Sequence, residues 1–352
     1  MTNIAIIGDE KTGRTSLAGV LGKKGTDSDI TLFNDDRHED KFVYIDSKSY
    51  PKSVKSIMAA LNLSDMAILC VSPDGLSTHT GECIVALDLI KMKRGVVVIT
   101  KSDESYPFAI DELKSKIKKV SEGTVVENWN IIAVNTNKNA SNPFEGIEDL
   151  KSEISNISIE IQKEMREKDD LSPRVVIDHF FNVTGIGVVI LGKVLQGTVH
   201  THDKIGLYPV DKKVDIRSIQ TQDTDVKEAK SGFRVGMALK GLLERELERG
   251  FLLSEKETIV EEITVDCKLT KFSKHGIQKD DSMNLYLGLQ SDAVRVLKIE
   301  KDGKEVEKAN PGDECRVTVK AGKRIALSKS DMIVLANLSE NQRFTASGFP
   351  ML

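Results

Sequence analysis

The chain begins with an apolar segment that runs into a loop bracketed by two glycines and then into a helical pattern. Residues 3–16 read NIAIIGDEKTGRTS. A phosphate-binding loop has a glycine, four residues, a second glycine, a lysine and a serine or threonine. Gly8 and Gly13 hold the glycine places; Thr15 supplies the hydroxyl, and Arg14 replaces the lysine. Because N–H groups at a helix N-terminus attract anions, the pattern predicts a phosphate site. Two turn glycines between a strand and a helix remain the alternative for this loop alone.

Composition limits the class of protein. A chain of 352 residues predicts two or three domains, since single cores rarely grow beyond about 250 to 300 residues. The net charge of −4 argues against a diffuse basic surface for nucleic acid, and we expect no DNA partner. No apolar run reaches the ~18 residues of a membrane span, so we expect a cytoplasmic protein without a membrane partner. The four cysteines and six histidines show no metal-ligand spacing.

Residues 1–172 alternate apolar strands with helical patterns, which predicts a mostly parallel sheet with helices on both faces. The strands are expected at 3–8, 30–34, 42–46, 67–72, 96–100 and 131–134. The helices are expected at 15–21, 51–61, 80–92, 110–119 and 146–168. Pro173 cannot lie inside a continuing helix, so a boundary is expected there. Short strands with frequent turn signals then predict two antiparallel β-barrels, at 173–256 and 257–352.

Two later motifs match the needs of a guanine nucleotide. Asp46 ends a predicted strand, where a carboxylate can hold a magnesium shell, and Ser49 follows where a glycine N–H usually meets the γ-phosphate. A strand-end capping residue is the alternative for Asp46. Further on, VVVITKSD places Thr100, Lys101 and Asp103 directly after a strand. The aspartate can accept both N–H groups on the guanine edge, and the lysine stem can cover the ring.

The last element of such a site is a backbone donor to the guanine oxygen. It is expected in AVNTNKN, at Asn135 and its neighbour Thr136. Four residues such as TKSD usually form a solvated turn when they occur alone. Their order after a phosphate loop and a strand-end aspartate favours a guanine site.

The segment after Pro173 resembles the second domain of the EF-Tu family of translational GTPases. VIDHFFNVTGIGVVILGKVLQGTVHTHDKIGLYP, GFRVGMALKGL and ELERGFLL carry the likeness. TKSD in place of NKxD is similar to SelB, the factor that delivers selenocysteyl-tRNA, and to the archaeal SelB-like group named EF-Pyl. The chain ends at Leu352 without the further domain with which SelB contacts a messenger hairpin, so reading of a messenger element stays open.

The resemblance implies the following site residues. Those expected to bind GTP or GDP are Gly8, Asp9, Lys11, Thr12, Gly13, Arg14, Thr15, Ser16, Asp46, Thr100, Lys101, Asp103 and Asn135. Thr15 and Asp46 are expected to hold Mg²⁺. Asp178, His179 and Arg234 fall on the positions of the SelB aminoacyl pocket, where they suit an anionic or strongly polar group. A structural ion pair between barrel strands is the alternative for Asp178 and Arg234.

Three features differ from the family pattern. Only residues 22–29 lie where a nucleotide-sensing loop is expected, and Thr31 is the one threonine placed to reach a metal. Tyr50 stands where these GTPases carry the histidine that positions the attacking water. Arg14 presents a planar fork in place of a compact ammonium group. No catalytic residue is assigned, and any GTP hydrolysis is expected to be slow.

The leading hypothesis is a monomeric elongation factor that binds guanine nucleotide and an aminoacyl-tRNA and delivers it to the ribosome. The alternative is a nucleotide-independent pseudo-GTPase whose barrels bind tRNA or a ribosomal partner. Another phosphate-loop enzyme, such as a kinase, is disfavoured by the ordered TKSD element and the two barrels. The amino acid stays open: the resemblance offers both selenocysteine and pyrrolysine.

Overall fold

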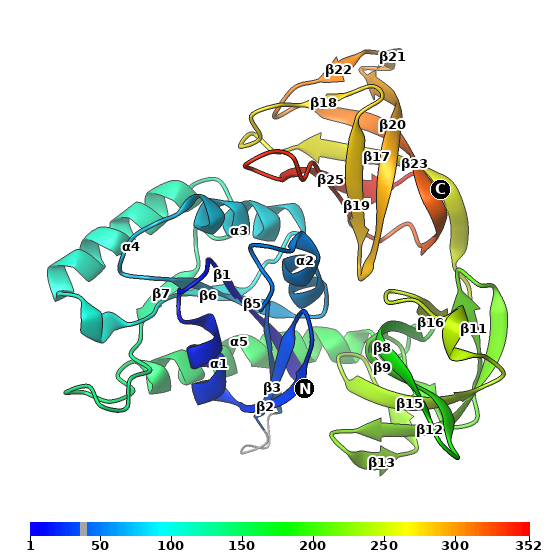
Figure 1. Ribbon diagram of the computed structural model, residues 1–352, viewed down its shortest axis with the longest axis horizontal. Coiled ribbons are helices and arrows are strands. Elements are labelled where there is room, and N and C mark those ends of the chain that lie inside the picture. Colours follow the sequence, from blue (N-terminus) through cyan, green and yellow to red (C-terminus); the bar gives the residue numbers. More distant parts are fainter. Residues whose placement is uncertain (36–40) are drawn as a thin grey trace. The chain divides into compact units, whose positions relative to one another are not determined.

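The computed structural model describes residues 1–35 and 41–352, which divide into two compact units, Met1–Gln162 and Lys163–Leu352. Among these residues, the first unit has a seven-stranded sheet in the order β2-β3-β4-β1-β5-β6-β7 (Figure 1). Its strands are β1 (Thr2–Gly8), β2 (Lys23–Asp27), β3 (Thr31–Asp35), β4 (Phe42–Asp46), β5 (Met66–Val71), β6 (Gly95–Ile99) and β7 (Asn130–Ala133). From β4 to β7 the strands are parallel.

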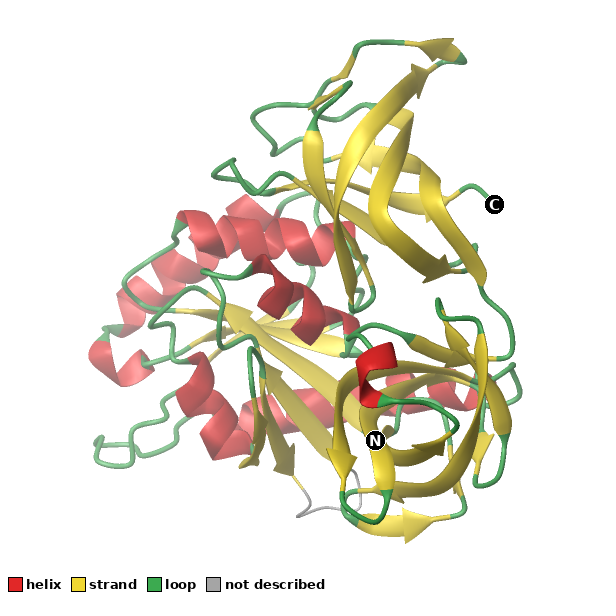
Figure 2. Ribbon diagram, turned by 45° about the vertical axis from the view of Figure 1, so that its right-hand side comes forward, coloured by secondary structure: helices red, strands yellow, loops and turns green. Residues whose placement is uncertain are grey.

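Helices cover both faces of this sheet. They are α1 (Arg14–Leu21), α2 (Val54–Asn62), α3 (Thr78–Leu89), α4 (Pro107–Ser121) and α5 (Ile147–Glu167). Figures 1 and 2 show α1 and α5 on one face and α2, α3 and α4 on the other. No helix in the described part of the chain is long and apolar enough to cross a membrane.

The strand sequences explain this arrangement. All seven residues of β1 and all six of β5 are buried. Strands covered on both faces need side chains that tolerate burial in either direction, so apolar residues are not restricted to alternate positions. Because parallel strands place their carboxyl ends at one edge, the loops after β1, β4 and β6 meet there.

Strand β2 was not expected from the sequence. KKGTD contains no apolar residue, and all five residues are exposed. It pairs with β3 as the edge of the sheet, with a bulge between Lys24 and Asp27. Part of the segment predicted to be a short loop therefore forms a β-hairpin.

The second unit carries two closed antiparallel barrels (Figure 2). In the described residues the first closes in the order β11-β16-β8-β9-β15-β12, with β12 pairing back to β11. Its strands are β8 (Arg174–Val183), β9 (Gly187–Gln196), β11 (Lys204–Tyr208), β12 (Lys212–Thr221), β15 (Arg234–Lys240) and β16 (Leu252–Ser254). The second closes in the order β19-β24-β25-β17-β23-β20, with β20 pairing back to β19. Its strands are β17 (Thr258–Leu269), β19 (Ser282–Leu287), β20 (Gln290–Lys301), β23 (Glu314–Leu327), β24 (Ile333–Ala336) and β25 (Phe344–Pro350).

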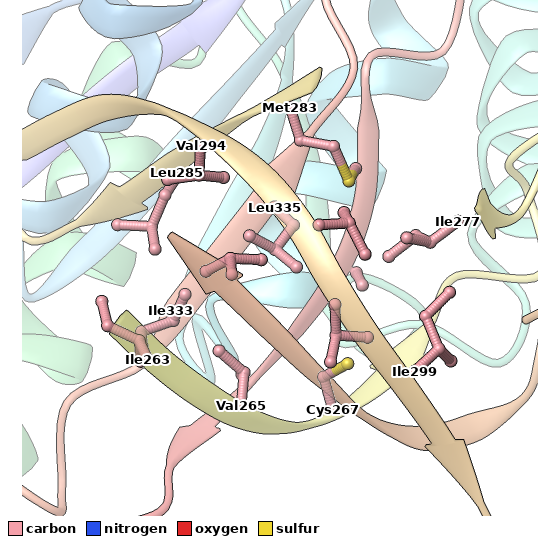
Figure 3. Close-up of a cluster of buried hydrophobic side chains, with 14 of the residues drawn as sticks. Ile263, Val265, Cys267, Ile277, Met283, Leu285, Val294, Ile299, Ile333 and Leu335 are labelled. Carbon is pink, nitrogen blue, oxygen red and sulfur yellow. The ribbon is translucent and has the colours of Figure 1, made fainter. Parts of the chain in front are cut away.

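Each barrel has its own apolar core. Val175, Ile190 and Leu253 are completely buried in the first. In the second, Val265, Leu285 and Leu335 point inward from three strands (Figure 3). The predicted fold class, an α/β sheet domain followed by two antiparallel barrels, is confirmed.

Arg174, at the start of β8, joins the two barrels. Its Nε lies 2.7 Å from Glu257 Oε1, and its Nη2 lies 2.6 Å from Asp331 Oδ2. The three side chains are 12%, 1% and 15% exposed. The two carboxylates raise the pKa of Arg174, although burial alone would lower it. The charged pairs therefore stabilise the contact between the barrels.

Candidate functional site

The loop after β1 has a backbone that requires glycine at two places. A Cβ atom at Gly8 would lie 2.5 Å from the carbonyl oxygen of Cys70, closer than side chains approach. Gly13 precedes α1 with φ of 75°, a left-handed conformation that favours glycine. In the described residues no side chain caps the start of α1. The partial positive charge of the helix N-terminus, where Thr15 and Ser16 are exposed, thus suits an anion.

Thr15 and Asp46 meet at the end of β4. The Thr15 hydroxyl donates a 2.6 Å hydrogen bond to Asp46 Oδ2. Asp46 is fully buried, and its Oδ1 has no hydrogen-bond partner among the described residues. Burial raises the pKa of this carboxyl more than Thr15 and Arg14 lower it. A carboxylate oxygen that lacks a hydrogen-bond partner and lies beside a hydroxyl fits the hard-oxygen ligands of Mg²⁺.

Arg14 has protein partners in place of solvent. Its Nη1 donates to the carbonyl oxygen of Ser47 at 2.8 Å and to Ser47 Oγ at 2.7 Å, and its Nη2 donates to Tyr50 O at 2.9 Å. Nη1 also lies 3.9 Å from Asp46 Oδ1, and the side chain is only 8% exposed. The guanidinium therefore fastens α1 to the loop after β4.

The other phosphate-loop residues form a tight local network. Asp9 Oδ1 accepts the Glu10 N–H at 2.6 Å and lies 3.1 Å from His79 Nδ1. Burial would raise the pKa of Asp9, but hydrogen bonds from Ser77 and Glu10 and the His79 ring hold it below its usual value. The Thr12 hydroxyl donates to Asp9 O at 2.8 Å. Lys11 is exposed in the left-handed region, with φ of 63°.

The loop after β4 is tied to the β2–β3 hairpin. The N–H of Ser49, which the sequence places near a γ-phosphate, donates to Asp29 O at 3.1 Å. Lys48 Nζ lies 2.8 Å from Asp27 Oδ1, which also accepts the Thr31 hydroxyl at 2.7 Å. Thr31 is 2% exposed. Both segments that would sense nucleotide are thus bonded to each other.

Tyr50 is part of the interior. Its hydroxyl lies 2.6 Å from Glu82 Oε2 and 3.1 Å from His79 O, and the residue is 1% exposed. Burial and the carboxylate of Glu82 raise its pKa. This hydroxyl is committed to α3, so Tyr50 does not present a polar group to solvent.

The predicted base-recognition loop, which follows β6, is connected to the predicted phosphate loop, which follows β1. The Thr100 hydroxyl donates a 2.6 Å hydrogen bond to Thr12 O. Lys101 has φ of 51°, and Asp103 follows in the short helix η1 (Ser102–Glu104), where it is exposed. Its Oδ2 accepts Nδ2 of Asn137 at 3.1 Å.

Asn137 belongs to this site although it was not predicted from the sequence. Its N–H donates to Asn135 Oδ1 at 2.6 Å, and Asn135 is 1% exposed. The two asparagines therefore join the predicted donor segment to Asp103. Asn137 follows Thr136 within AVNTNKN, so an extension of that motif by one residue would have found it.

The first barrel gathers two other predicted residues and one further arginine around the predicted Asp178. The register of β8 shifts between Ile177 and His179, at a β-bulge that changes the direction in which the Asp178 side chain points. Asp178 is 1% exposed. Asp178 Oδ2 accepts Nη2 of Arg234 at 2.9 Å and lies 3.3 Å from His179 Nδ1. Arg249, missed from the sequence, donates from Nε at 3.0 Å and from Nη2 at 2.8 Å to Oδ1.

The environment of Asp178 favours its ionised form. Burial would raise its pKa, but the adjacent His179 ring and the charges of Arg234 and Arg249 bring the pKa well below its ordinary value. Two guanidinium groups therefore face the one carboxylate of Asp178. A group of this kind attracts an anionic or strongly polar ligand.

Comparison with known proteins places the chain in a family. The domain family Elongation factor Tu domain 2 matches residues 187–254. An uncharacterized protein of Methanocaldococcus jannaschii is 32% identical over 287 residues, 80% of this chain and 83% of that protein. The selenocysteine-specific elongation factor of the same organism is 27% identical over 367 residues, 96% of this chain and 76% of that protein. The chain belongs to the SelB-like branch of the EF-Tu family.

Solved structures of that branch share the fold. The crystal structure of translation elongation factor SelB from Methanococcus maripaludis with the GTP analogue GppNHp has a TM-score of 0.84 and 23% identity. The alignment covers 100% of this chain and 79% of that one. Its apo form has a TM-score of 0.82. This SelB-like chain therefore has the fold of SelB.

Proposed function

We propose that this chain is a SelB-like elongation factor that binds guanine nucleotide without switching and holds an aminoacyl-tRNA for delivery to the ribosome. It acts as a monomer with domains at 1–172, 173–256 and 257–352. The supporting observation is the 2.6 Å hydrogen bond from the Thr100 hydroxyl to Thr12 O. This bond holds the base-recognition loop against the phosphate loop. The parts that would bind the base and the phosphates are therefore fixed relative to each other.

In this proposal each retained element has a role. The loop from Gly8 to Gly13 and the N-terminus of α1 hold phosphates through backbone N–H groups. Asp103 accepts the N–H groups of guanine, with Asn137 orienting its carboxylate at 3.1 Å. Thr15 and Asp46 hold Mg²⁺, which neutralises charge on the phosphates when bound. Arg14 stabilises the fold and is not a phosphate ligand.

The proposal departs from an ordinary GTPase in the absence of a switch. A γ-phosphate orders sensing loops because it offers contacts that the diphosphate lacks. Here the Ser49 N–H bonds to Asp29, and the Thr31 hydroxyl bonds to Asp27. A nucleotide that binds two conformations of the protein with equal affinity does not shift the equilibrium between them. GTP and GDP are therefore expected to bind with similar affinity.

The aminoacyl end of the tRNA is assigned to the Asp178 cluster. Arg249 adds a second guanidinium charge beside that of Arg234 in this cluster. His179 and Arg249 are each 28% exposed, so both are accessible to a ligand. This charge favours an anionic head such as the selenolate of selenocysteine over the neutral side chain of pyrrolysine.

One observation favours the second candidate, a nucleotide-independent tRNA-binding or ribosome-binding protein. Arg14, at the lysine position, is committed to Ser47 and Tyr50 by three hydrogen bonds. Asp9 and Glu10 add negative charge to the loop. With Arg14 unavailable to a phosphate, the first domain would serve as a scaffold alone.

Calorimetry separates these candidates. Purified protein is titrated with GTP, GDP and ATP, with and without Mg²⁺, alongside the Asp103→Asn variant. The proposal predicts guanine-specific binding that weakens by about tenfold or more in the variant, because one hydrogen bond to a charged group is lost. Absence of binding by every nucleotide would leave the second candidate.

The aminoacyl assignment has its own test. Arg234→Ala and Arg249→Ala are compared in their affinity for charged and uncharged tRNA. Loss of affinity for charged tRNA alone supports the pocket. Equal loss for both tRNAs would make the Asp178 cluster structural.

A further inference from the structure

An aspartate–histidine pair lies at the edge of the phosphate loop. His79 is in the first turn of α3, and its Nδ1 is 3.1 Å from Asp9 Oδ1. Its side chain is 40% exposed and that of Asp9 is 20% exposed. Ser77 begins α3 with a capping box, in which Ser77 Oγ accepts the Thr80 N–H at 3.1 Å. The capped helix holds His79 in place while leaving part of its ring accessible.

Asp9 orients the imidazole. The same Oδ1 atom accepts the Glu10 N–H at 2.6 Å, so the carboxylate is fixed to the loop backbone. In a neutral imidazole, Nδ1–H donating to a carboxylate leaves Nε2 as an acceptor. This is the arrangement by which an aspartate prepares a histidine to take a proton.

The His79 ring lies beside Tyr50, and this position indicates what the Asp9–His79 pair does. The rings of His79 and Tyr50 pack edge to face with centroids 6.0 Å apart and an interplanar angle of 80°. Tyr50 occupies the family's water-positioning place, but its hydroxyl is bonded to Glu82 at 2.6 Å. The His79 imidazole, on α3, thus lies beside that place and contacts Asp9, the second residue of the phosphate loop.

Resting on the proposed nucleotide binding, we infer that His79 is the group that orients the water attacking the γ-phosphate of GTP. Water adds through its oxygen to the phosphorus as the bond to GDP breaks. Nε2 of His79 takes a proton from this water and returns it to the released phosphate. The products are GDP and inorganic phosphate. Asp9 is a positioning residue that acts through His79.

Single-turnover GTP hydrolysis tests the inference in the full chain. His79→Ala is expected to slow hydrolysis by about 100-fold, the usual size of one general base, while GTP affinity stays within about twofold. Added imidazole is expected to restore part of the rate, which a merely structural role would not permit. His79→Gln, which can still hydrogen-bond to water, is expected to lose less. His275→Ala, a 56% exposed histidine in the second unit, is the matched control.

A second readout does not depend on turnover. Addition of the non-hydrolysable GTP analogue GppNHp should shift the imidazole NMR signals of His79 and leave those of His275 unchanged. A wild-type rate of hydrolysis in His79→Ala would overturn the role of His79 but leave the proposed nucleotide binding intact. The absence of an imidazole shift in protein that binds the analogue would do the same. Bound GTP that wild-type protein does not hydrolyse would do the same. Absence of nucleotide binding by calorimetry would instead refute the proposed nucleotide function, and this inference with it.

Discussion

Replacement of Arg14 by lysine restores the residue that phosphate loops usually carry, and we predict that it weakens this protein. The guanidinium makes three hydrogen bonds with two partners, Ser47 and Tyr50, and is 8% exposed. Lysine keeps the charge but has no planar fork that reaches both partners at once. Arg14→Lys therefore weakens the link between α1 and the loop after β4.

The magnitude follows from the contacts that are lost. A hydrogen bond to a charged group contributes about 1.5 to 3 kcal/mol. If lysine keeps one of the three bonds, the first unit loses about 3 kcal/mol, allowing for relaxation and non-additivity. That is a large part of the 5–15 kcal/mol that holds a typical domain folded.

The chain contains one tryptophan, Trp129, in the first unit, so its fluorescence reports the unfolding of that unit. Urea titration of wild type and Arg14→Lys gives the difference in free energy of unfolding. Lys11→Ala, in the same loop but exposed, is the control and should change stability by less than about 0.5 kcal/mol. Equal stability of Arg14→Lys and wild type would refute the structural role of Arg14.

Three further predictions concern stability. Arg174→Ala should lower the free energy of unfolding of the second unit by about 3–5 kcal/mol, because two carboxylates lose their counter-charge. Circular dichroism in denaturant measures this, and a loss below about 1 kcal/mol would contradict it. Tyr50→Phe should destabilise the first unit by about 1–3 kcal/mol, since the 2.6 Å hydrogen bond from the Tyr50 hydroxyl to buried Glu82 is lost. Tryptophan-detected unfolding measures this, and an unchanged free energy of unfolding would refute it.

The third follows from the lowered pKa of Asp178. Its stabilisation is full above its ordinary pKa of 3.8 and is lost as the pH falls through the lower, folded-state value. Wild type should therefore lose stability faster than Asp178→Asn below about pH 4, and parallel acid titrations of the two would contradict this.

The linear motifs made much of this protein predictable. Strand β1 and Asp46 could be placed because apolar runs and turn glycines carry a strong local signal. Strand β2 could not, since KKGTD has no apolar residue and forms only by pairing with β3. Its existence depends on a partner that local periodicity does not report.

Side-chain partners were harder to predict than motif positions. Thr15 was expected near Asp46, and the two share a hydrogen bond. Arg14 was expected at the phosphate because of its place in the motif, but the interior offers it carbonyl oxygens. Arg249 and His79 have no spacing signal, because they reach Asp178 and Asp9 from elements distant in the sequence.

The central claim is that nucleotide does not switch this factor, and tRNA affinity tests it most directly. The affinity for selenocysteyl-tRNA is measured with GTP, with GDP and without nucleotide, with uncharged tRNA as reference. The account predicts affinities within about threefold in all three states and weaker binding of uncharged tRNA, because no differential contact links γ-phosphate to the switch segments. A preference of tenfold or more for the GTP state would show that these segments respond to the γ-phosphate and would contradict the account.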